Sequence, residues 1–376
     1  MKKIHMVDLL SQYEKIQNEV DTAVLDVVKS GAYINGPEVK EFAKELENYL
    51  GVKHVIPCAN GTDALQIALM AAGCQPGDEV ITPSFTYVAT AEVIALLNLK
   101  PVFVEVEPNA FTLDPEAVKN AITSKTKAII PVHLYGICAP MDEIMAIGKE
   151  HGIAVIEDTA QALGSTYTNG QGQKVKAGAI GDIGCTSFFP SKNLGCFGDG
   201  GAIFTQNDEL ASQIRMIANH GQSKRYYHDS IGVNSRLDSI QAAILRIKLR
   251  HLDQYLEARN TAASYYDNAF ASHAGIHSPA RVSYSDHGFH QYTLKLDDGI
   301  DRDGMIEHLN SKGIPANIYY PVPIHLQKGY SNYGYTTGDL LVTEDLCSRV
   351  FSLPMHTEFQ EEQLKFITDA VLEFAG

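Results

Sequence analysis

One lysine near the middle of the chain has neighbours that suit a nucleophilic amine. Lys192 lies in SFFPSKNLGCFGDGG, where it is the only cation among apolar, small and glycine residues. Removal from water lowers the pKa of a lysine and makes its neutral amine available as a nucleophile. A lysine in a surface loop beside a glycine-rich turn has the same local sequence. The residue types around Lys192 therefore leave both interpretations open.

A carboxylate stands 34 residues before this lysine. Asp158 follows the apolar run IAVIE, which predicts a strand, and precedes TAQALG, which predicts the start of a helix. A carboxylate at this position either faces a ligand or caps the following helix. Gln161 lies in the same segment and is an ordinary helical residue unless a site lies beside it.

Two further segments carry groups that suit a planar, anionic ligand. CANGTDALQIAL predicts a helix that begins at an Asn-Gly-Thr turn, so the amides of Gly61 and Thr62 and the Thr62 hydroxyl can hold an anion at the positive end of the helix. Many helices begin with a similar cap, and this feature alone does not define a site. Tyr87, in PSFTYVATA, follows a predicted strand and either stacks on a planar ligand or packs in the core.

Taken together, the four features match the needs of a pyridoxal 5′-phosphate site. In such a site a lysine forms a Schiff base with the cofactor and a carboxylate pairs with the pyridinium nitrogen. An aromatic ring stacks on the cofactor, and amides with hydroxyls hold its phosphate. The order along the chain is phosphate turn, aromatic residue, aspartate and lysine, which is the order in fold type I pyridoxal phosphate enzymes. We therefore predict a cofactor site of this kind, with no metal ion.

The elements that would position these residues alternate along the first two-thirds of the chain. Short β-branched apolar runs are separated by segments of helical pattern, such as 62–73 and 141–152. This alternation predicts an α/β domain with a mainly parallel central sheet and helices on both faces. In such sheets ligands bind at the carboxyl ends of the strands. The runs expected to form strands are 79–83, 101–106, 127–134, 153–158 and 201–206.

The pattern changes after residue 238. Residues 239–270 have apolar residues at helical spacing and charges on the opposite face, which predicts one long helix that joins two domains. Beyond His273, a strand, a helix and a Tyr- and Pro-rich segment predict a smaller α+β domain. We therefore expect a large domain of residues 1–254, including the N-terminal segment, and a small domain of residues 255–376.

The overall charge excludes some partners. The 376 residues include 30 Lys and Arg against 45 Asp and Glu, which gives a formal charge of −15. Such a field repels nucleic acid and anionic membranes, so we expect neither as a partner.

The N-terminus does not have the pattern of a secretory signal, and no apolar run approaches the roughly 18 residues of a membrane span. The six cysteines form no C-x-x-C pair. We expect reduced thiols and a cytoplasmic protein.

Over nearly its whole length the chain resembles the DegT/DnrJ/StrS sugar aminotransferases. The pairing of EDTAQALG with SFFPSKN is highly specific to this family. The resemblance implies fold type I architecture and a homodimer with bound pyridoxal phosphate. It also implies transfer of an amino group, usually from L-glutamate, to a keto group of a nucleotide-linked sugar. The other matching segments are SGAYINGPEVKEFAKELENYLGVKH, NGTDAL, PSFTYVATAE, PVHLYG, NSRLDSIQAAIL and YYPVPIHLQ.

The resemblance also implies roles for individual residues. The Schiff-base lysine of the family falls on Lys192, and the partner of the pyridinium nitrogen falls on Asp158. Asn234 of NSRLD would reach from the neighbouring subunit to the phosphate, which would make dimerisation a condition of cofactor binding; without the resemblance, a turn-forming Asn is the simpler interpretation. The remaining cofactor contacts fall on Gly61, Thr62 and Ser187 at the phosphate, Tyr87 against the ring and Gln161 near the 3-hydroxyl.

Substrate contacts are expected from two segments. Arg236 of NSRLD can hold a carboxylate or phosphate with two hydrogen bonds, although a solvated ion pair fits the sequence equally well. Tyr319, Tyr320 and His325 of NIYYPVPIHL are expected to line the sugar or nucleotide pocket. The lysine segment is most similar to that of UDP-2-acetamido-3-oxo-glucuronate aminotransferases of surface-polysaccharide and lipopolysaccharide synthesis. In that activity Arg236 would meet the uronate carboxylate.

Other functions remain as alternatives. Aminotransferases of dTDP-3-keto-6-deoxyhexoses and of 4-keto sugars share much of the same sequence. Family members that have lost the lysine, often to histidine, are sugar dehydratases, and the presence of Lys192 favours amino transfer. A binding or regulatory protein that kept the fold without the cofactor is an alternative from another class. The intact Asp158, Lys192 and phosphate turn argue against it.

Overall fold

A seven-stranded sheet forms the centre of the molecule, of which the computed structural model describes residues 2–376. The strand order is β1-β9-β8-β5-β4-β2-β3, with β3, β2, β4, β5 and β8 mutually parallel. Strand β9 runs antiparallel to β8, and β1 runs antiparallel to β9. The sheet is therefore mainly parallel, as predicted. Its strands are β1 (His54–Cys58), β2 (Glu79–Pro83), β3 (Lys100–Val104), β4 (Thr126–Ile129), β5 (Ala154–Asp158), β8 (Ile183–Ser187) and β9 (Gly201–Thr205).

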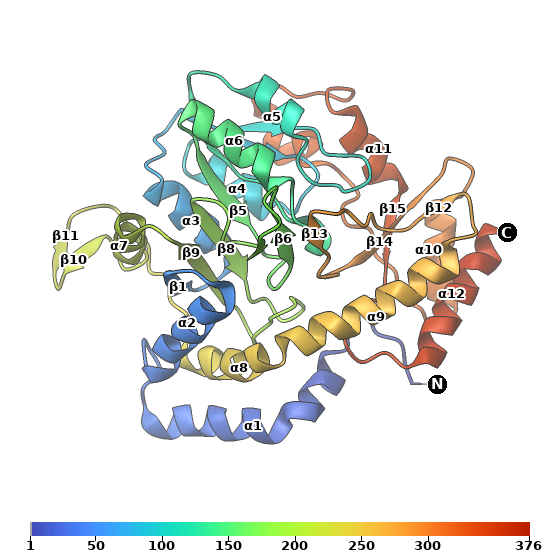
Figure 1. Cartoon of the computed structure of the whole chain (residues 1–376), viewed down its shortest axis with the longest axis horizontal. Coiled ribbons are helices and arrows are strands. Elements are labelled where there is room, and N and C mark those ends of the chain that lie inside the picture. The colour runs from blue at the N-terminus through green and yellow to red at the C-terminus, as the bar shows by residue number, and fades with distance from the viewer. Residues whose placement is uncertain (1) are drawn as a thin grey trace.

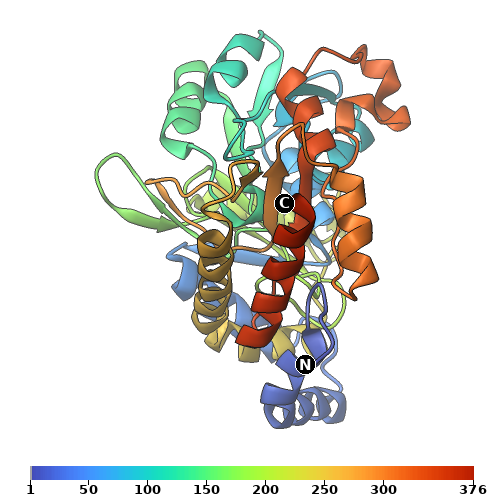
Figure 2. The same cartoon turned by 90° about the vertical axis from the view of Figure 1, so that its right-hand side faces the viewer.

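Helices cover both faces of this sheet because successive side chains along each strand point to opposite sides. Val80 packs in the core beneath α3 (Gly61–Ala71), α4 (Ala89–Leu96) and α7 (Asp208–Ile217). The next residue, Ile81, packs in the core beneath α5 (Pro115–Ala121) and α6 (Met141–His151). Figures 1 and 2 show these helices on the two sides of the sheet.

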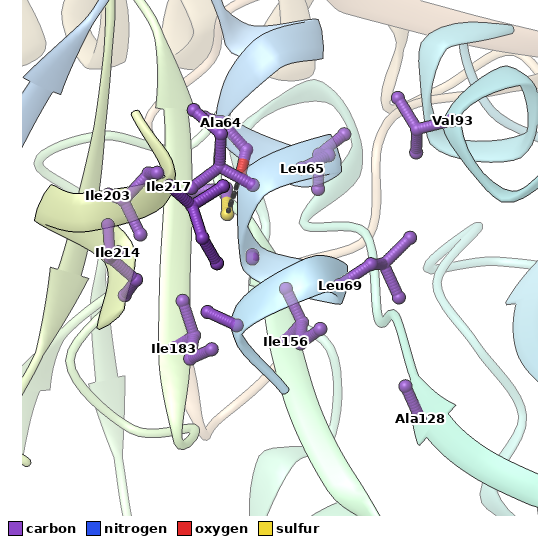
Figure 3. Close-up of a cluster of buried hydrophobic side chains, with 14 of the residues drawn as sticks. Ala64, Leu65, Leu69, Val93, Ala128, Ile156, Ile183, Ile203, Ile214 and Ile217 are labelled. Atoms are coloured by element: carbon purple, nitrogen blue, oxygen red, sulfur yellow. Dashed lines mark hydrogen bonds between the residues drawn. The ribbon is translucent and has the colours of Figure 1, made fainter. Parts of the chain in front are cut away.

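Helix α3 is buried against the sheet along most of its length. Figure 3 shows Leu65 and Leu69 of α3 among aliphatic side chains from the strands and from α7. The thiol of Cys185 on β8 donates a hydrogen bond to the carbonyl of Ala64 at 3.4 Å. This packing fixes the beginning of α3 relative to the end of β8.

The predicted single helix over 239–270 is two helices. Helix α8 (Ser239–Arg250) ends before His251, and α9 (Leu252–Phe270) continues from there toward α12 on the right of Figure 1. Helix α8 contacts α2 (Pro37–Leu50) and α1 (Leu9–Ser30), and Leu252 at the start of α9 still packs in the same cluster as α8, whereas α9 from Ala262 onward packs with C-terminal elements.

The C-terminal third builds a separate hydrophobic cluster around a three-stranded sheet in the order β12-β14-β15. Ile4, from the N-terminal segment, is buried in this cluster, while α8 packs with the large sheet. The division at residues 254 and 255 falls just inside α9 and stays a prediction. The elements are β12 (Ile276–His277), β14 (Tyr292–Leu296), β15 (Val350–Leu353), α10 (Arg302–Ser311), α11 (Leu341–Arg349) and α12 (Glu361–Ala375).

Several small elements lie outside the seven-stranded sheet and the β12-β14-β15 sheet. β6 and β7 form a hairpin to which β13 adds, and β10 and β11 form a projecting hairpin. Within residues 2–376, no helix is both long and apolar enough to cross a membrane, and no group of acidic, His and Cys side chains is arranged to hold a metal ion. The remaining bounds are β6 (Thr166–Thr168), β7 (Lys174–Lys176), β10 (Gln222–Lys224), β11 (Tyr227–His228), β13 (Ser285–Asp286), η1 (Leu134–Gly136), η2 (Ile324–Leu326) and η3 (Lys328–Tyr333).

Candidate active site

The predicted cofactor residues follow strands that end at one edge of the central sheet. β5 ends at Asp158 and β8 ends at Ser187, and these two strands are parallel neighbours. β1 has the same direction as β8, because both run antiparallel to β9, and it leads into Gly61 at the start of α3. The carboxyl ends of parallel strands are the usual ligand-binding edge. The fold therefore brings together segments that are far apart in the sequence.

Asp158 is buried, and both of its carboxylate oxygens are held by neighbouring donors. The Thr90 hydroxyl donates to Oδ2 at 2.9 Å, and the amide of Ala160 donates to Oδ1 at 3.1 Å. The predicted helix after Asp158 is wrong: residues 160–164 form turns, because the chain reverses at Gly164, whose φ is +94°, and enters β6. Asp158 thus accepts a local amide with one oxygen, while the Thr90 hydroxyl orients the other.

Lys192 lies in the loop between β8 and β9, with its side chain in the region of Asp158. Burial lowers the pKa of the Lys192 amine to about 8, although the nearby Asp158 carboxylate acts in the opposite direction. The amine makes no hydrogen bond or ion pair with residues 2–376. It therefore combines a lowered pKa with the absence of a fixed partner, as a nucleophile requires.

The lowered pKa leads to a direct chemical prediction. We expect the reaction of Lys192 with an amine-specific reagent, in full-length protein freed of cofactor, to reach half its maximal rate near pH 8, because the amine is neutral above that pH. The same segment as a free peptide should react with the midpoint of an ordinary lysine, about 10.4. Mass spectrometry of the labelled peptide across pH 6 to 11 measures both. A common midpoint for protein and peptide would contradict the prediction.

The start of α3 and the end of β8 form a close-packed cradle. A Cβ atom on Gly61 would lie 2.7 Å from Cβ of Ser187, so only glycine fits at this position. The Asn60 side chain accepts from the amide of Asp63 at 2.8 Å and caps the helix. The first amides of a helix have no acceptor within it, so those of Gly61 and Thr62 are suited to an anion beside the Ser187 hydroxyl.

A hydrogen-bonded chain joins the C-terminal third to this edge of the sheet. Gln161 accepts from the amide of Tyr135 at 2.7 Å and donates to the hydroxyl of Tyr320 at 3.1 Å. The Tyr135 hydroxyl donates to the carbonyl of Tyr319. The rings of Tyr87 and Tyr320 lie 6.2 Å apart, and Tyr87 is 57% exposed. Tyr87 is therefore not a core residue, and part of its surface is free to meet a ligand.

Asn234 and Arg236 occupy an accessible loop next to the phosphate turn. Ser235, between them, is buried and accepts from the amide of Ala59 at 2.9 Å. Asn234 is exposed and Arg236 is half-buried. Within residues 2–376 Arg236 has no ion-pair partner, so the solvated ion pair considered from the sequence is not formed inside the subunit.

His325 is placed differently from the other predicted residues. It is buried, with Nδ1 at 2.7 Å from the Ser84 hydroxyl and Nε2 at 3.2 Å from a carboxylate oxygen of Glu344. Both ring nitrogens thus have intramolecular partners, which attach η2 to the loop that follows β2 through Ser84 and to α11 through Glu344. The substrate contact expected for His325 stays a prediction.

Two residues of this arrangement were not expected from the sequence. Thr90 lies in the PSFTYVATA segment, but no spacing signals that its hydroxyl reaches Asp158. Tyr135 lies in PVHLYG and has a positive φ of 57°, which an ordinary tyrosine rarely adopts. This backbone conformation gives Tyr135 contacts with both Gln161 and Tyr319. Only the folded chain reveals these partners.

The whole chain is similar to known aminotransferases. A model of the DegT/DnrJ/EryC1/StrS aminotransferase family matches residues 14–372. UDP-2-acetamido-2-deoxy-3-oxo-D-glucuronate aminotransferase of Pseudomonas aeruginosa is 45% identical over 368 residues, which are 98% of this chain and 99% of that protein. The Pleiotropic regulatory protein of Geobacillus stearothermophilus is 45% identical over 373 residues, 99% and 98% of the two chains.

A solved aminotransferase structure has the same fold as this chain. NtdA from Bacillus subtilis, with the cofactor PMP bound, superposes with a TM-score of 0.90 at 30% sequence identity, covering 100% of this chain and 86% of that chain. The predicted fold class and the predicted family are thus confirmed. The chain belongs to the DegT/DnrJ/EryC1/StrS aminotransferase family.

Proposed function

We propose that this chain is a pyridoxal phosphate-dependent aminotransferase that moves the amino group of L-glutamate to the 3-keto group of UDP-2-acetamido-2-deoxy-3-oxo-glucuronate. The observation that carries the proposal is the pairing of Lys192, an amine with a pKa of about 8 and no fixed partner, with the buried carboxylate of Asp158. Both lie at the carboxyl edge of the sheet. Membership of an aminotransferase family supports the same conclusion.

The residues at this edge fit the cofactor. Gly61, Thr62 and Ser187 would hold its phosphate, because the missing side chain of Gly61 leaves room for the Ser187 side chain against the first turn of α3. Asp158, oriented by the Thr90 hydroxyl, would hold a proton on the ring nitrogen. When bound, pyridoxal phosphate supplies an electron sink for the carbon that carries the amino group.

Lys192 is the group suited to attach the cofactor and to move protons. Its lowered pKa of about 8 lies close to neutral pH, where a general base works most efficiently. The Lys192 amine would take a proton from the α-carbon of glutamate. In the second half of the exchange it would deliver a proton to the sugar carbon that receives the amino group. Tyr87 would cover one face of the site and limit its contact with water.

The choice of substrate rests on sequence similarity and on Arg236. The Pseudomonas aeruginosa relative that acts on the 3-oxo-glucuronate is 45% identical over nearly the whole chain. Glutamate, the cofactor and the nucleotide sugar are all anions, whereas the chain carries a formal charge of −15. Local donors must therefore create a positive pocket, and Arg236 has no competing carboxylate within residues 2–376.

We infer that the active form is a homodimer in which Asn234 and Arg236 serve the site of the second copy. The exposure of Asn234 and the free guanidinium of Arg236 support this arrangement. Large apolar residues next to this loop are also uncovered in the single chain, with Tyr226 78% exposed and Ile231 86% exposed. A second copy would bury such a surface.

Substitution of Arg236 by alanine is expected to raise KM for the 3-keto uronate about 10- to 100-fold, the loss typical of hydrogen bonds to a charged group. The KM for a matching sugar without the carboxylate should change little. Steady-state kinetics with both sugars measures the difference. Arg250→Ala, which removes an exposed arginine paired with Glu19, is the matched control. An equal change for both sugars would contradict the uronate assignment.

Mixed dimers test the contribution of the second copy. Lys192→Ala and Asn234→Ala chains, each inactive alone, should regain activity when co-purified as heterodimers, because one of the two sites then has both residues intact. Absence of recovery in a purified heterodimer would place Asn234 in its own subunit's site.

A regulatory role is the second candidate, because a protein with that designation is as similar as the sugar aminotransferase. A panel of UDP- and dTDP-linked 3-keto and 4-keto sugars, offered with glutamate, separates the possibilities through release of 2-oxoglutarate. Turnover with the UDP 3-keto uronate supports the proposal, whereas preference for a dTDP or 4-keto sugar corrects the substrate. A colourless protein that does not take up pyridoxal phosphate would overturn the enzymatic function.

A further inference from the structure

A buried histidine behind the end of β5 has partners on both of its ring nitrogens. His133 follows β4, is fully buried, and has no role in the chemistry proposed above. Its Nε2 atom lies 2.8 Å from a carboxylate oxygen of Glu157, and its Nδ1 atom accepts from the amide of Ala139 at 3.1 Å. A backbone amide only donates, so Nδ1 carries no proton and the proton of the ring is on Nε2. The imidazole therefore donates to Glu157 and accepts from Ala139.

The carboxylate that accepts from His133 is held on every side. Glu157 immediately precedes Asp158 on β5, and its side chain is buried on the opposite face of the strand. Besides His133, it accepts from three backbone amides of residues 178–181 at distances of 2.6–2.9 Å. These donors satisfy the carboxylate, as the burial of a charge requires. The position of the Glu157 side chain is thus fixed, and with it the backbone at the carboxyl end of β5.

The main chain around His133 also pairs with Asp158. The amide of Asp158 donates to the carbonyl of Pro131 at 2.9 Å, and the amide of His133 donates to the carbonyl of Asp158 at 3.0 Å. His133 therefore contacts Glu157 through its side chain and Asp158 through its backbone. Because Glu157 and Asp158 are consecutive, loss of the Nε2 contact would displace the carboxylate that is proposed to meet the ring nitrogen.

The contact at Nδ1 closes the turn that holds Gln161. The bond from Ala139 to His133 spans residues 133–139, a turn in which Tyr135 has a φ of +57°. The amide of Tyr135 donates to the side-chain oxygen of Gln161 at 2.7 Å. Loss of the Nδ1 contact would open this turn and release the amide that orients Gln161.

We propose that His133 is a positioning residue with two separate arms. The Nε2 arm acts through Glu157 and sets the carboxylate of Asp158 for the ring nitrogen of the cofactor. The Nδ1 arm acts through Ala139 and sets Gln161 for the 3-hydroxyl. This rests on the proposed function, which supplies the two contacts with the ring. Because the arms leave from different nitrogen atoms, substitution can remove one and keep the other.

Two conservative substitutions separate the arms. In His133→Gln the side-chain amide nitrogen takes the place of Nε2 and donates to Glu157, but the acceptor for Ala139 is gone. In His133→Asn the side-chain oxygen takes the place of Nδ1 and accepts from Ala139, but the donor to Glu157 is gone. His133→Leu removes both arms. If the ring only filled space, the Gln and Asn variants would not differ in opposite directions.

The Nε2 arm is measured in full-length protein that carries pyridoxamine 5′-phosphate labelled with ¹⁵N in its ring. NMR as the pH is raised follows the proton on the ring nitrogen. We expect the pKa of this nitrogen to fall by about one unit in the Asn and Leu variants, because Asp158 is displaced, and to stay close to the original in the Gln variant. An unchanged pKa in the Asn variant, or an equal fall in all three, would overturn the proposal.

The Nδ1 arm is measured in the full chain without cofactor, by hydrogen exchange of residues 131–139. We expect the amides of Tyr135 and Ala139 to exchange about 10-fold faster in the Gln and Leu variants, and at nearly the original rate in the Asn variant. The original rate in the Gln variant would overturn the proposal. This measurement requires neither cofactor nor turnover, so failure of the aminotransferase function would be recognised separately, by the absence of pyridoxal phosphate uptake.

Tyr292→Phe is the matched control for lost stability. The buried Tyr292 hydroxyl on β14 donates to Asp267 at 2.7 Å, so this variant loses a buried hydrogen bond away from β5 and from the turn at 133–139. It should lower the melting temperature and change neither measurement. Changes equal to those of the His133 variants would show a general effect of destabilisation and would overturn the specific role of His133.

A measurement on the unaltered protein covers the case in which the His133 variants do not fold. NMR of the protein labelled with ¹⁵N-histidine, with His133 assigned through its backbone, shows which ring nitrogen carries the proton. We expect a proton on Nε2 and none on Nδ1. A proton on Nδ1 is incompatible with the bond from Ala139 and would overturn the proposal.

Discussion

Replacement of Lys192 by alanine is expected to lower the rate of amino transfer at least about 10³-fold, because it removes the residue proposed both to attach the cofactor covalently and to move the proton. The variant should still take up cofactor, since the cradle at Gly61 and Ser187 is unaltered. Formation of 2-oxoglutarate from glutamate, in the presence and absence of the keto sugar, measures the loss. Absorbance measurements with glutamate alone and with the keto sugar alone then show whether either half-reaction still proceeds in the variant.

The chain supplies a close control for this experiment. Lys248 on α8 is buried, and burial lowers its pKa to about 8, as for Lys192, yet the groups that act on it are Cys196 and Arg259 and not Asp158. Lys248→Met keeps most of the side-chain volume and should retain activity within a few-fold. Full turnover by the Lys192→Ala variant would remove the basis of the proposed function. Equal losses in the two variants, with lowered thermal stability in both, would indicate damage to packing.

Replacement of Asp158 by asparagine is expected to reduce kcat about 10²- to 10³-fold, the effect of removing one preorganised charge from a catalytic site. An amide cannot stabilise a proton on the ring nitrogen, and the cofactor would lose much of its capacity to withdraw electrons. The asparagine nitrogen also cannot accept from Thr90, which donates to Asp158 at 2.9 Å. Single-turnover kinetics with glutamate measures the step that depends on this charge.

Asp182→Asn is the matched control for the charge. Asp182 accepts from the amide of Val155 at 2.9 Å, and it lies near the opposite end of β5 from Asp158. Loss of the Asp182 charge should lower the free energy of unfolding slightly and leave kcat nearly unchanged. If Asp158→Asn kept wild-type kinetics, the ring nitrogen would have no anionic partner at this position and the cofactor orientation proposed above would be wrong.

The local sequence predicted those parts of the fold in which the residue types favour the observed backbone conformation and also suit the observed burial. The apolar runs at 79–83 and 153–158 are central strands covered on both faces, and Gly152 ends α6 with a φ of +66°. Two strands had no such signal. β1 contains Pro57, which is tolerated because β1 is at the edge of the sheet. β8 contains Gly184, where a Cβ would lie 2.1 Å from the Gly178 carbonyl.

The sequence by itself predicted most of the proposed chemistry. It contains a lysine, a strand-end aspartate and a helix-start glycine, and their types and order match the sequence pattern of one family. Their partners were decided only by the tertiary structure. The Thr90 contact with Asp158 spans 68 residues, and the contact of Asn193 with the segment before His290 spans 95. Contacts of this range depend on sheet order and helix packing, which no local preference encodes. The sequence therefore supplied the proposed reacting groups, and the fold decided which side chains orient them.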